Sequence, residues 1–209
     1  MAAGTLVASC TVATILHGTP WSNLGILELR TYGVDNVQLA NGQWWRLLTA
    51  QFVHAKQPHM LFSVITLFLL GAVIEESTGP VRFALVWLLT GVLGTYASIY
   101  AVPPPYDIGS GASQALMGVA GAAAIVVTRR AHHRPKWLIP TLVITLGCQL
   151  GMDLAFGHSV KPGHIVPFVV GMAIAVVLVP KLVSKTSADS GTHLVGTKEG
   201  TDAADGARG

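Results

Sequence analysis

The chain has 209 residues, of which 51% are hydrophobic and 11% are charged, and its formal net charge is +3. Soluble domains keep about a quarter of their residues charged, so this composition excludes an ordinary soluble protein and indicates a membrane protein. The small positive charge gives no support for a nucleic-acid partner, because Lys and Arg cluster beside the apolar segments, where they act as topology signals. We therefore expect the lipid bilayer as a partner, and no nucleic acid.

Six apolar segments follow one another along the chain, and most approach the roughly 20 residues that a helix needs to cross a bilayer. They comprise residues 3–17, 57–74, 83–106, 108–128, 137–152 and 162–180. The first has no basic residue before it, so we interpret it as a retained helix and not as a cleaved signal peptide. The sequence thus predicts an all-α membrane protein in which residues 1–183 form a bundle of six transmembrane helices.

The loop at residues 129–136 sets the expected orientation, because it is rich in Lys and Arg and such loops stay in the cytoplasm. With six spans, both termini are then cytoplasmic in a multi-pass protein of the cell membrane, and residues 18–56 form a long external segment. The tail at residues 184–209 is polar and rich in glycine. It cannot bury enough apolar surface to offset the entropy of ordering, so we expect a disordered cytoplasmic tail.

Three polar side chains are expected at one depth, near the outer ends of the second, fourth and sixth spans. Each lies 16 or 17 residues from a charged residue that marks the cytoplasmic end of its span: His59 from Glu75, Ser113 from Arg129, and His164 from Lys181. At about 1.5 Å per residue, the three side chains lie about 24 Å above that end, just below the outer edge of a hydrocarbon core about 30 Å thick. They are therefore candidates for one shared site.

The stretch around Ser113 has features that suit nucleophilic chemistry. A serine hydroxyl is a weak nucleophile until a neighbouring base takes its proton, and a neutral imidazole, from either His59 or His164, suits this task. Glycines before Ser113 let the backbone approach a substrate, and its own N–H at a helix start can face an oxyanion. Below it, Ala115, Gly118 and Ala122 recur at helical spacing and allow close packing against neighbouring helices. The stretch is therefore a candidate nucleophile site, although serines and glycines in membrane helices also serve helix packing alone.

Other polar residues near this depth are given simpler roles. Ser110 lies upstream of the helix start and is expected to serve the loop, although it stays open as a second nucleophile. His158, in the loop before the sixth span, stays open as an alternative base. His54 is expected to hydrogen-bond its loop, ahead of a helix that Pro58 opens. Asp153, near the outer end of the fifth span, is expected to be solvated at the membrane interface and not catalytic.

Several motifs carry a family resemblance. They are Gly111-Ala-Ser-Gln114, which is similar to GxSx; Gly163-His164 with Gly171 seven residues on; His54-Ala-Lys-Gln-Pro-His59-Met-Leu-Phe-Ser63, which matches HxxxxHxxxN except at its end; and Gly42-Gln-Trp-Trp-Arg46. With these motifs, the chain from about Gly42 to Lys181 resembles the rhomboid family of intramembrane serine proteases.

The resemblance implies a rhomboid-like bundle in which Ser113 is the nucleophile and His164 the base of a dyad. It implies that His59 helps to bind the oxyanion, with Ser63 as a weaker helper, and that Trp45 and Arg46 have structural roles in the external loop. The implied reaction is hydrolysis of transmembrane-protein substrates near the outer membrane face. It implies no cofactor and no metal.

Three residues depart from the family's pattern. Ser63 stands where the family has asparagine, so a shorter hydroxyl replaces an amide donor and reaches the site through water. Met117 stands in place of a tyrosine that stacks on the base, and its thioether can still pack on the ring. Pro167 replaces a glycine, so the sixth helix is expected to begin near His164 or to kink there.

Two other functions stay open at this point. The three departures also fit a catalytically inactive rhomboid-like protein that binds transmembrane clients, and intramembrane histidines also fit a small transporter or proton path. A metal site made from the histidines is a further alternative, but the chain lacks the HExxH spacing of a zinc protease.

Overall fold

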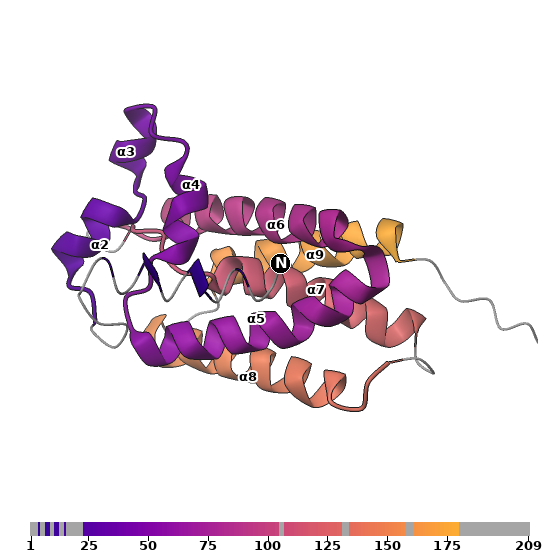
Figure 1. Cartoon of the computed structure of the whole chain (residues 1–209). Coiled ribbons are helices and arrows are strands. Elements are labelled where there is room, and N and C mark those ends of the chain that lie inside the picture. The colour runs from indigo at the N-terminus through magenta and orange to yellow at the C-terminus, as the bar shows by residue number, and fades with distance from the viewer. Residues whose placement is uncertain are drawn as a thin grey trace, which may run out of the picture.

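The computed structural model describes residues 23–104, 107–130, 134–157 and 161–179, together with isolated positions among the first 22 residues. Over these ranges the chain folds into helices joined by short loops (Figure 1). The predicted first span at residues 3–17, the alternative base His158 and the tail at 184–209 lie largely or wholly outside them. For the described part of the chain, the expectation of an all-α fold is confirmed.

Within the described ranges, five long helices run alongside one another and form a bundle (Figure 1). They are α5 (Gln57–Thr78), α6 (Pro80–Ala101), α7 (Ser113–Arg129), α8 (Leu138–Gly157) and α9 (Pro162–Leu178). Every residue of α7 from Ser113 to Ala123 is buried, so this helix is covered on all sides. The core of the bundle is therefore built around α7, which begins with the candidate nucleophile.

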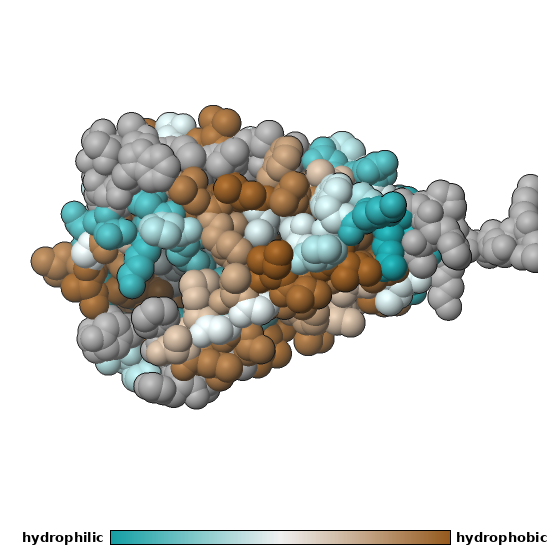
Figure 2. Space-filling view, turned by 90° about the horizontal axis from the view of Figure 1, so that it is seen from below, coloured by the Kyte–Doolittle hydropathy of each residue, from teal (hydrophilic) through white to brown (hydrophobic). Residues whose placement is uncertain are grey.

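The helix lengths and the apolar surface fit a membrane environment. α5, α6 and residues Leu138–Ala155 of α8 are long and apolar enough to cross a membrane, whereas α7 and α9 are shorter apolar helices. Large apolar side chains such as Phe68, Leu89 and Val169 are exposed on the outside of the bundle. Figure 2 shows apolar residues over much of one face, with hydrophilic residues gathered toward its ends. Exposed apolar side chains over the middle of a helix bundle are suited to lipid. The count of six spans stays a prediction, because most of residues 3–17 are not described.

Two predicted spans are longer than the helices that the structure shows, namely residues 83–106 and 108–128. α6 ends at Ala101, because the prolines that follow cannot continue a helix. α7 begins only at Ser113, because the chain before it is extended: Gly109 and Val34 exchange two backbone hydrogen bonds of 2.7 and 3.0 Å. Both apolar segments therefore extend beyond their helices, whereas the helix start expected at Ser113 agrees with the structure.

Short helices cover the end of the bundle at which α7 begins (Figure 1). They are α2 (Ile26–Tyr32), α3 (Asn36–Ala40), α4 (Arg46–Thr49) and the 3-10 turn η1 (Ala50–Phe52). Arg46 donates hydrogen bonds to the carbonyls of Thr31, at 2.7 Å, and Gly33, at 2.9 Å. Gly33 precedes Val34, which pairs with Gly109. The expected structural role of Arg46 is confirmed, and it supports the segment that leads to Ser113.

Candidate active site

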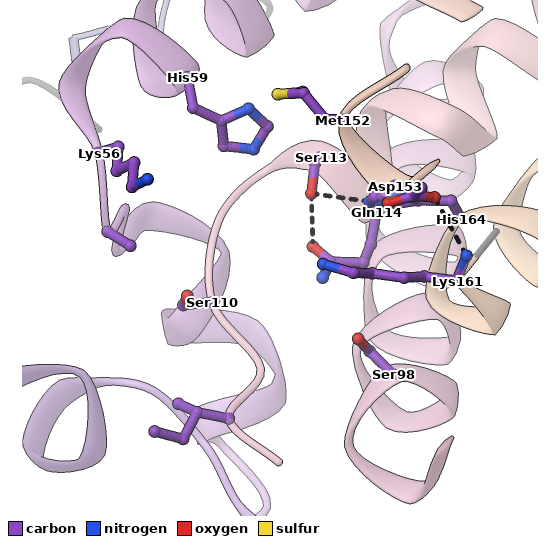
Figure 3. Close-up of a pocket in the computed structure, with 12 residues that line it drawn as sticks. Lys56, His59, Ser98, Ser110, Ser113, Gln114, Met152, Asp153, Lys161 and His164 are labelled. Carbon is purple, nitrogen blue, oxygen red and sulfur yellow. Dashed lines mark hydrogen bonds and ion pairs between the residues drawn. The ribbon is translucent and has the colours of Figure 1, made fainter. Parts of the chain in front are cut away.

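The side chains of Ser113 and His164 meet at the end of the bundle that carries α2–α4. Ser113 is the first residue of α7, and His164 lies in the first turn of α9. The Oγ atom of Ser113 lies 3.2 Å from the Nε2 atom of His164 (Figure 3). Only 4% of Ser113 and 8% of His164 is exposed. The hydroxyl and the imidazole are therefore within hydrogen-bonding distance in a site that excludes most solvent.

A cavity of about 280 Å³ opens beside this pair. We call it the active-site cavity; among its lining residues are His59 from α5, Ser113 and Gln114 from α7, Asp153 from α8 and His164 from α9. In Figure 3, Ser113 lies between His59 and His164. The structure thus brings His59, Ser113 and His164 together, because all three line one cavity.

The predicted oxyanion residues His59 and Ser63 lie in different surroundings. The His59 ring points into the active-site cavity, and its Nδ1 atom has no hydrogen-bond partner among the residues that the structure describes. Ser63, one helical turn further along α5, is completely buried and does not line that cavity. Its hydroxyl also lacks a partner within the described ranges. Of the two residues, His59 is thus brought directly to the cavity and Ser63 is not.

Asp153 corrects the expectation from the sequence. It was expected to be solvated at the interface, but only 2% of it is exposed. Its Oδ2 atom lies 2.8 Å from Nδ1 of His164 and accepts a hydrogen bond of 3.1 Å from the backbone N–H of Lys161. The expectation was wrong because α8 turns this face inward, against the start of α9. The structure therefore adds a buried carboxylate behind the imidazole.

A pattern on α8 could have pointed to Asp153. Thr145, Gln149 and Asp153 recur every four residues in an otherwise apolar helix, and all three are buried. Residues at this spacing share one helix face, and polar residues in a membrane helix rarely face lipid. The polar stripe therefore marks the side of α8 that faces the rest of the bundle.

Gln114 is a second residue of the site that the sequence did not single out. It follows Ser113 directly, is 5% exposed and lines the active-site cavity. The Ser113 hydroxyl donates to its Oε1 atom at 3.4 Å, which is a longer contact than the one between Ser113 and His164. The hydroxyl therefore has two acceptors, and the imidazole is the nearer.

His54 holds the loop that leads to Ser113. Its Nε2 atom accepts a hydrogen bond of 3.1 Å from the backbone N–H of Ala112, as the sequence predicted for a loop-binding role. His54 lies outside the long helices, and burial, with a smaller contribution from neighbouring His59, lowers its pKa to about 3. Gly111 beside it has a φ of 92°, which a residue with a Cβ adopts only with strain. A neutral imidazole and a glycine together fix the turn into α7.

The structure also places Ser110, Pro167 and Met117, which were named from the sequence. Ser110 also lines the active-site cavity, but the serine hydroxyl hydrogen-bonded to the imidazole belongs to Ser113. α9 begins at Pro162, so the helix does start close to His164, and Pro167 lies inside it. Met117 and His164 both line a second, mainly apolar cavity of about 270 Å³.

Metal binding receives no support from the described ranges, where no group of three or more His, Cys, Asp or Glu side chains is arranged to hold an ion. The charged side chains that line the active-site cavity with Asp153 are Lys56 and Lys161. Because the Ser113 hydroxyl lies within hydrogen-bonding distance of His164, its proton can pass to the imidazole. The Ser113 oxygen can then attack an electrophile bound in the cavity.

Comparison with known proteins gives one consistent result. A family model described as the Rhomboid domain matches residues 41–181. The chain is 30% identical over 144 residues to "Rhomboid protease GluP" of Bacillus subtilis, covering 69% of this chain and 28% of that protein. It is 27% identical over 185 residues to "Rhomboid protease AarA" of Providencia stuartii, covering 73% of this chain and 63% of that protein. It is also 32% identical over 82 residues to "Inactive RHOMBOID-like protein 8" of Arabidopsis thaliana, covering 39% of this chain and 23% of that protein. The chain thus spans less than two thirds of the length of each.

Proposed function

Because the chain belongs to the rhomboid family, we propose that it is an intramembrane serine endopeptidase in which Ser113 and His164 form a catalytic dyad. Its substrates are transmembrane proteins, which it cleaves near the outer face of the cell membrane. The observation that carries this proposal is the distance of 3.2 Å between Ser113 Oγ and His164 Nε2 beside a cavity. Polar side chains inside membrane proteins are costly to bury, so a buried hydroxyl paired with an imidazole indicates a functional site.

Acylation begins when Ser113 Oγ attacks the carbonyl carbon of the scissile peptide bond. The hydroxyl proton passes to Nε2 of His164, and the same proton is then given to the leaving amine as the carbon–nitrogen bond breaks. Water hydrolyses the acyl-enzyme when His164 takes one of its protons and Ser113 leaves with that proton restored. The reaction needs no cofactor, since each proton that His164 accepts is returned.

The negative charge that develops on the carbonyl oxygen requires hydrogen-bond donors. We assign this role to His59, whose ring points into the active-site cavity, and to the backbone N–H of Ser113. N–H groups in the first turn of a helix have no acceptor within the helix, so the N–H of Ser113 can face a substrate oxygen. Ser63, which lies one turn from His59, is a weaker helper that acts through water.

The substrate must present an extended segment, because a peptide bond inside a helix cannot reach Ser113 past its own side chains. The active-site cavity supplies polar surroundings for such a segment through Gln114 and Lys161. Small or helix-breaking residues near the outer end of the substrate's membrane span make this unwinding easier. Water for deacylation enters by the same opening.

The other candidate is a protein that binds transmembrane clients without cutting them. The likeness to a relative named as inactive and the departures at Ser63, Met117 and Pro167 favour this reading. A fluorophosphonate probe separates the two, because it reacts only with an activated serine. Labelling of the wild type, and none of Ser113→Ala, supports the protease.

The deciding experiment is cleavage of a generic transmembrane substrate by the purified full chain in detergent. Wild type is compared with Ser113→Ala and His164→Ala, and with Ser110→Ala as a matched serine control that lines the same cavity. The proposal expects cleavage by the wild type and Ser110→Ala, and none by the two dyad variants. A folded wild type that neither cleaves nor reacts with the fluorophosphonate makes the client-binding protein the better description.

A further inference from the structure

The carboxylate of Asp153 is buried at a place where burial is unfavourable. It lies on α8, a helix apolar enough to cross a membrane, and only 2% of the residue is exposed. A charged group in such a position is retained when it is paired and hydrogen-bonded. Its two partners here are Nδ1 of His164, at 2.8 Å, and the backbone N–H of Lys161, at 3.1 Å. Both bonds join the end of α8 to the start of α9.

We propose that Asp153 is a positioning residue that orients His164 within the Ser113–His164 dyad; this inference rests on the proposed protease function. The imidazole is contacted on both nitrogens, with Asp153 at Nδ1 and Ser113 at Nε2. A carboxylate without a proton can only accept, so it holds the ring proton on Nδ1. Nε2 is then left with a lone pair that points at the Ser113 hydroxyl, which is the tautomer that base catalysis needs.

Among the described side chains around His164, Asp153 is the acceptor that is bonded to Nδ1 and sets this tautomer. Behind the His164 ring, the second cavity is lined mainly by apolar side chains, among them Leu146, Ile165 and Phe168. Gln149 also lines it, one turn before Asp153, but His164 Nδ1 is bonded to the carboxylate. The other titratable groups that line the active-site cavity are Lys56, His59 and Lys161. None of these side chains is bonded to Nδ1 within the described ranges.

During the reaction, the carboxylate of Asp153 stabilises the protonated ring of His164. When Ser113 attacks, its proton goes to Nε2, and the ring becomes an imidazolium with protons on both nitrogens. The Nδ1 proton stays on the ring, and the carboxylate stabilises the positive charge without taking it up. The proton on Nε2 then leaves with the amine. Asp153 returns to its starting state unchanged, so the step needs no additional reactant.

A purely structural role makes a different prediction. If Asp153 only tied α8 to α9, its loss would lower stability and substrate binding, while folded protein would keep its turnover rate. If it sets the tautomer, an isosteric amide would leave the fold in place and still slow the reaction, because an amide can donate to Nδ1 and stabilise the wrong tautomer. The separation of kcat from KM is therefore the informative readout.

The experiment uses the full chain in detergent and compares wild type with Asp153→Asn, Asp153→Glu and Gln149→Leu. Gln149 is a matched control, because it is a buried polar residue on the same face of α8. We measure kcat and KM on a transmembrane substrate, the rate of fluorophosphonate labelling of Ser113, and the thermal unfolding of each variant.

We expect Asp153→Asn to lower kcat and the labelling rate by about 100-fold or more while KM stays within about threefold. Asp153→Glu restores a carboxylate and should regain at least about tenfold over Asp153→Asn, and Gln149→Leu should stay within about threefold of wild type. Labelling is counted per folded molecule, so a partly unfolded variant still gives an answer.

Two results overturn the role of Asp153 while leaving the protease intact. One is an Asp153→Asn variant whose folded fraction labels and turns over like the wild type. The other is an Asp153→Glu variant no faster than Asp153→Asn. By contrast, a folded wild type that neither cleaves nor labels overturns the proposed function, and the role of Asp153 falls with it.

Discussion

Gly171 of α9 lies directly against the backbone of Gly118 of α7. A Cβ atom built at Gly171 would collide with the carbonyl group of Gly118, and one built at Gly118 would collide with the side chain of Thr90 on α6. Small residues at helix contacts let backbones approach closely in membranes. This contact sets the separation of the two helices that carry Ser113 and His164, so the packing of α7 on α9 fixes how these two side chains meet.

Enlarging Gly171 tests this link. Gly171→Ala should lower stability by about 1–3 kcal/mol, because the added methyl group overpacks the contact. It should also lower kcat, because α9 and His164 must move away from Ser113. Thermal unfolding and cleavage rates check both expectations.

Gly147→Ala is the matched control for Gly171→Ala. Nothing lies within 4 Å of a Cβ built at Gly147, which is also inside a long helix. Alanine is favoured over glycine in helices, so Gly147→Ala should leave activity unchanged and stability equal or slightly higher. Equal effects of the two substitutions would contradict the importance of the Gly118–Gly171 contact.

His54, which binds the loop before Ser113, should make the free energy of unfolding depend on pH. The pKa of His54 falls from an ordinary 6.5 to about 3 in the folded protein, chiefly because the ring is buried. Between these values the unfolded chain binds a proton that the folded chain excludes, so the contribution of His54 to stability is present above 6.5 and is lost as pH falls. His54→Gln keeps an acceptor for the Ala112 N–H but does not titrate. Unfolding temperatures over this pH window should decline more steeply for wild type than for His54→Gln, and parallel curves would contradict the role.

Arg46 should support the site from a distance. Arg46→Ala removes hydrogen bonds to the carbonyls of Thr31 and Gly33, so we expect a loss of about 1–3 kcal/mol and easier proteolysis of the α2–α4 segment. Fluorophosphonate labelling of Ser113 should fall as well, because Gly33 precedes the residue that pairs with Gly109. Arg82→Ala, at an exposed arginine on α6, is the control. An Arg46→Ala protein that resists protease like the control would refute this support.

The residues of the site differ in how far the sequence could predict them. The common depth of His59, Ser113 and His164 followed from charge positions, because the rise of a helix is fixed. That argument gives height but not direction around the helix, so it could not tell that Asp153 faces His164. The direction depends on how α8 packs beside α9, which is set by contacts between distant parts of the chain. The family resemblance implied the roles of His59, Ser113 and His164. Only the packing of the helices showed that the carboxylate of Asp153 lies beside His164.

The extended segment before α7 also depends on a contact between distant parts of the chain, which the local sequence does not predict. Residues 108–112 belong to an apolar, uncharged run, and composition alone extends the following helix through them. The pairing of Gly109 with Val34 joins residues 75 positions apart, and no local pattern reveals it. The prolines after α6 were the local signal for a break in the chain, and they correctly mark the end of that helix.

The number of spans and their orientation can be tested directly. Six spans with a cytoplasmic loop at residues 129–136 require that residues 18–56 and the start of α7 face outward. Single cysteines introduced at Lys56 and at Arg134, in a chain whose own cysteines are replaced, should react with a membrane-impermeant thiol reagent from opposite sides of intact cells. Labelling of both positions from the same side would contradict the proposed topology and cleavage at the outer face.

The proposed oxyanion donors His59 and Ser63 lie one helical turn apart on α5, yet their substitution by alanine should have different effects on kcat. His59 points into the active-site cavity, so His59→Ala should lower kcat by about 100-fold with little change in KM, because the donor acts on charge that develops only in the transition state. Ser63 has a buried hydroxyl without a partner among the described residues, so Ser63→Ala should leave stability equal or raise it.

Ser63→Ala should also lower kcat by less than about tenfold, since its hydroxyl acts only through water. Steady-state kinetics and thermal unfolding of both variants check the pair. If Ser63→Ala slows turnover as much as His59→Ala, the hydroxyl must reach the oxyanion more directly than its buried position allows. α5 would then have to rotate when substrate binds, and the cavity formed by His59 and Ser113 would be a resting state of the enzyme.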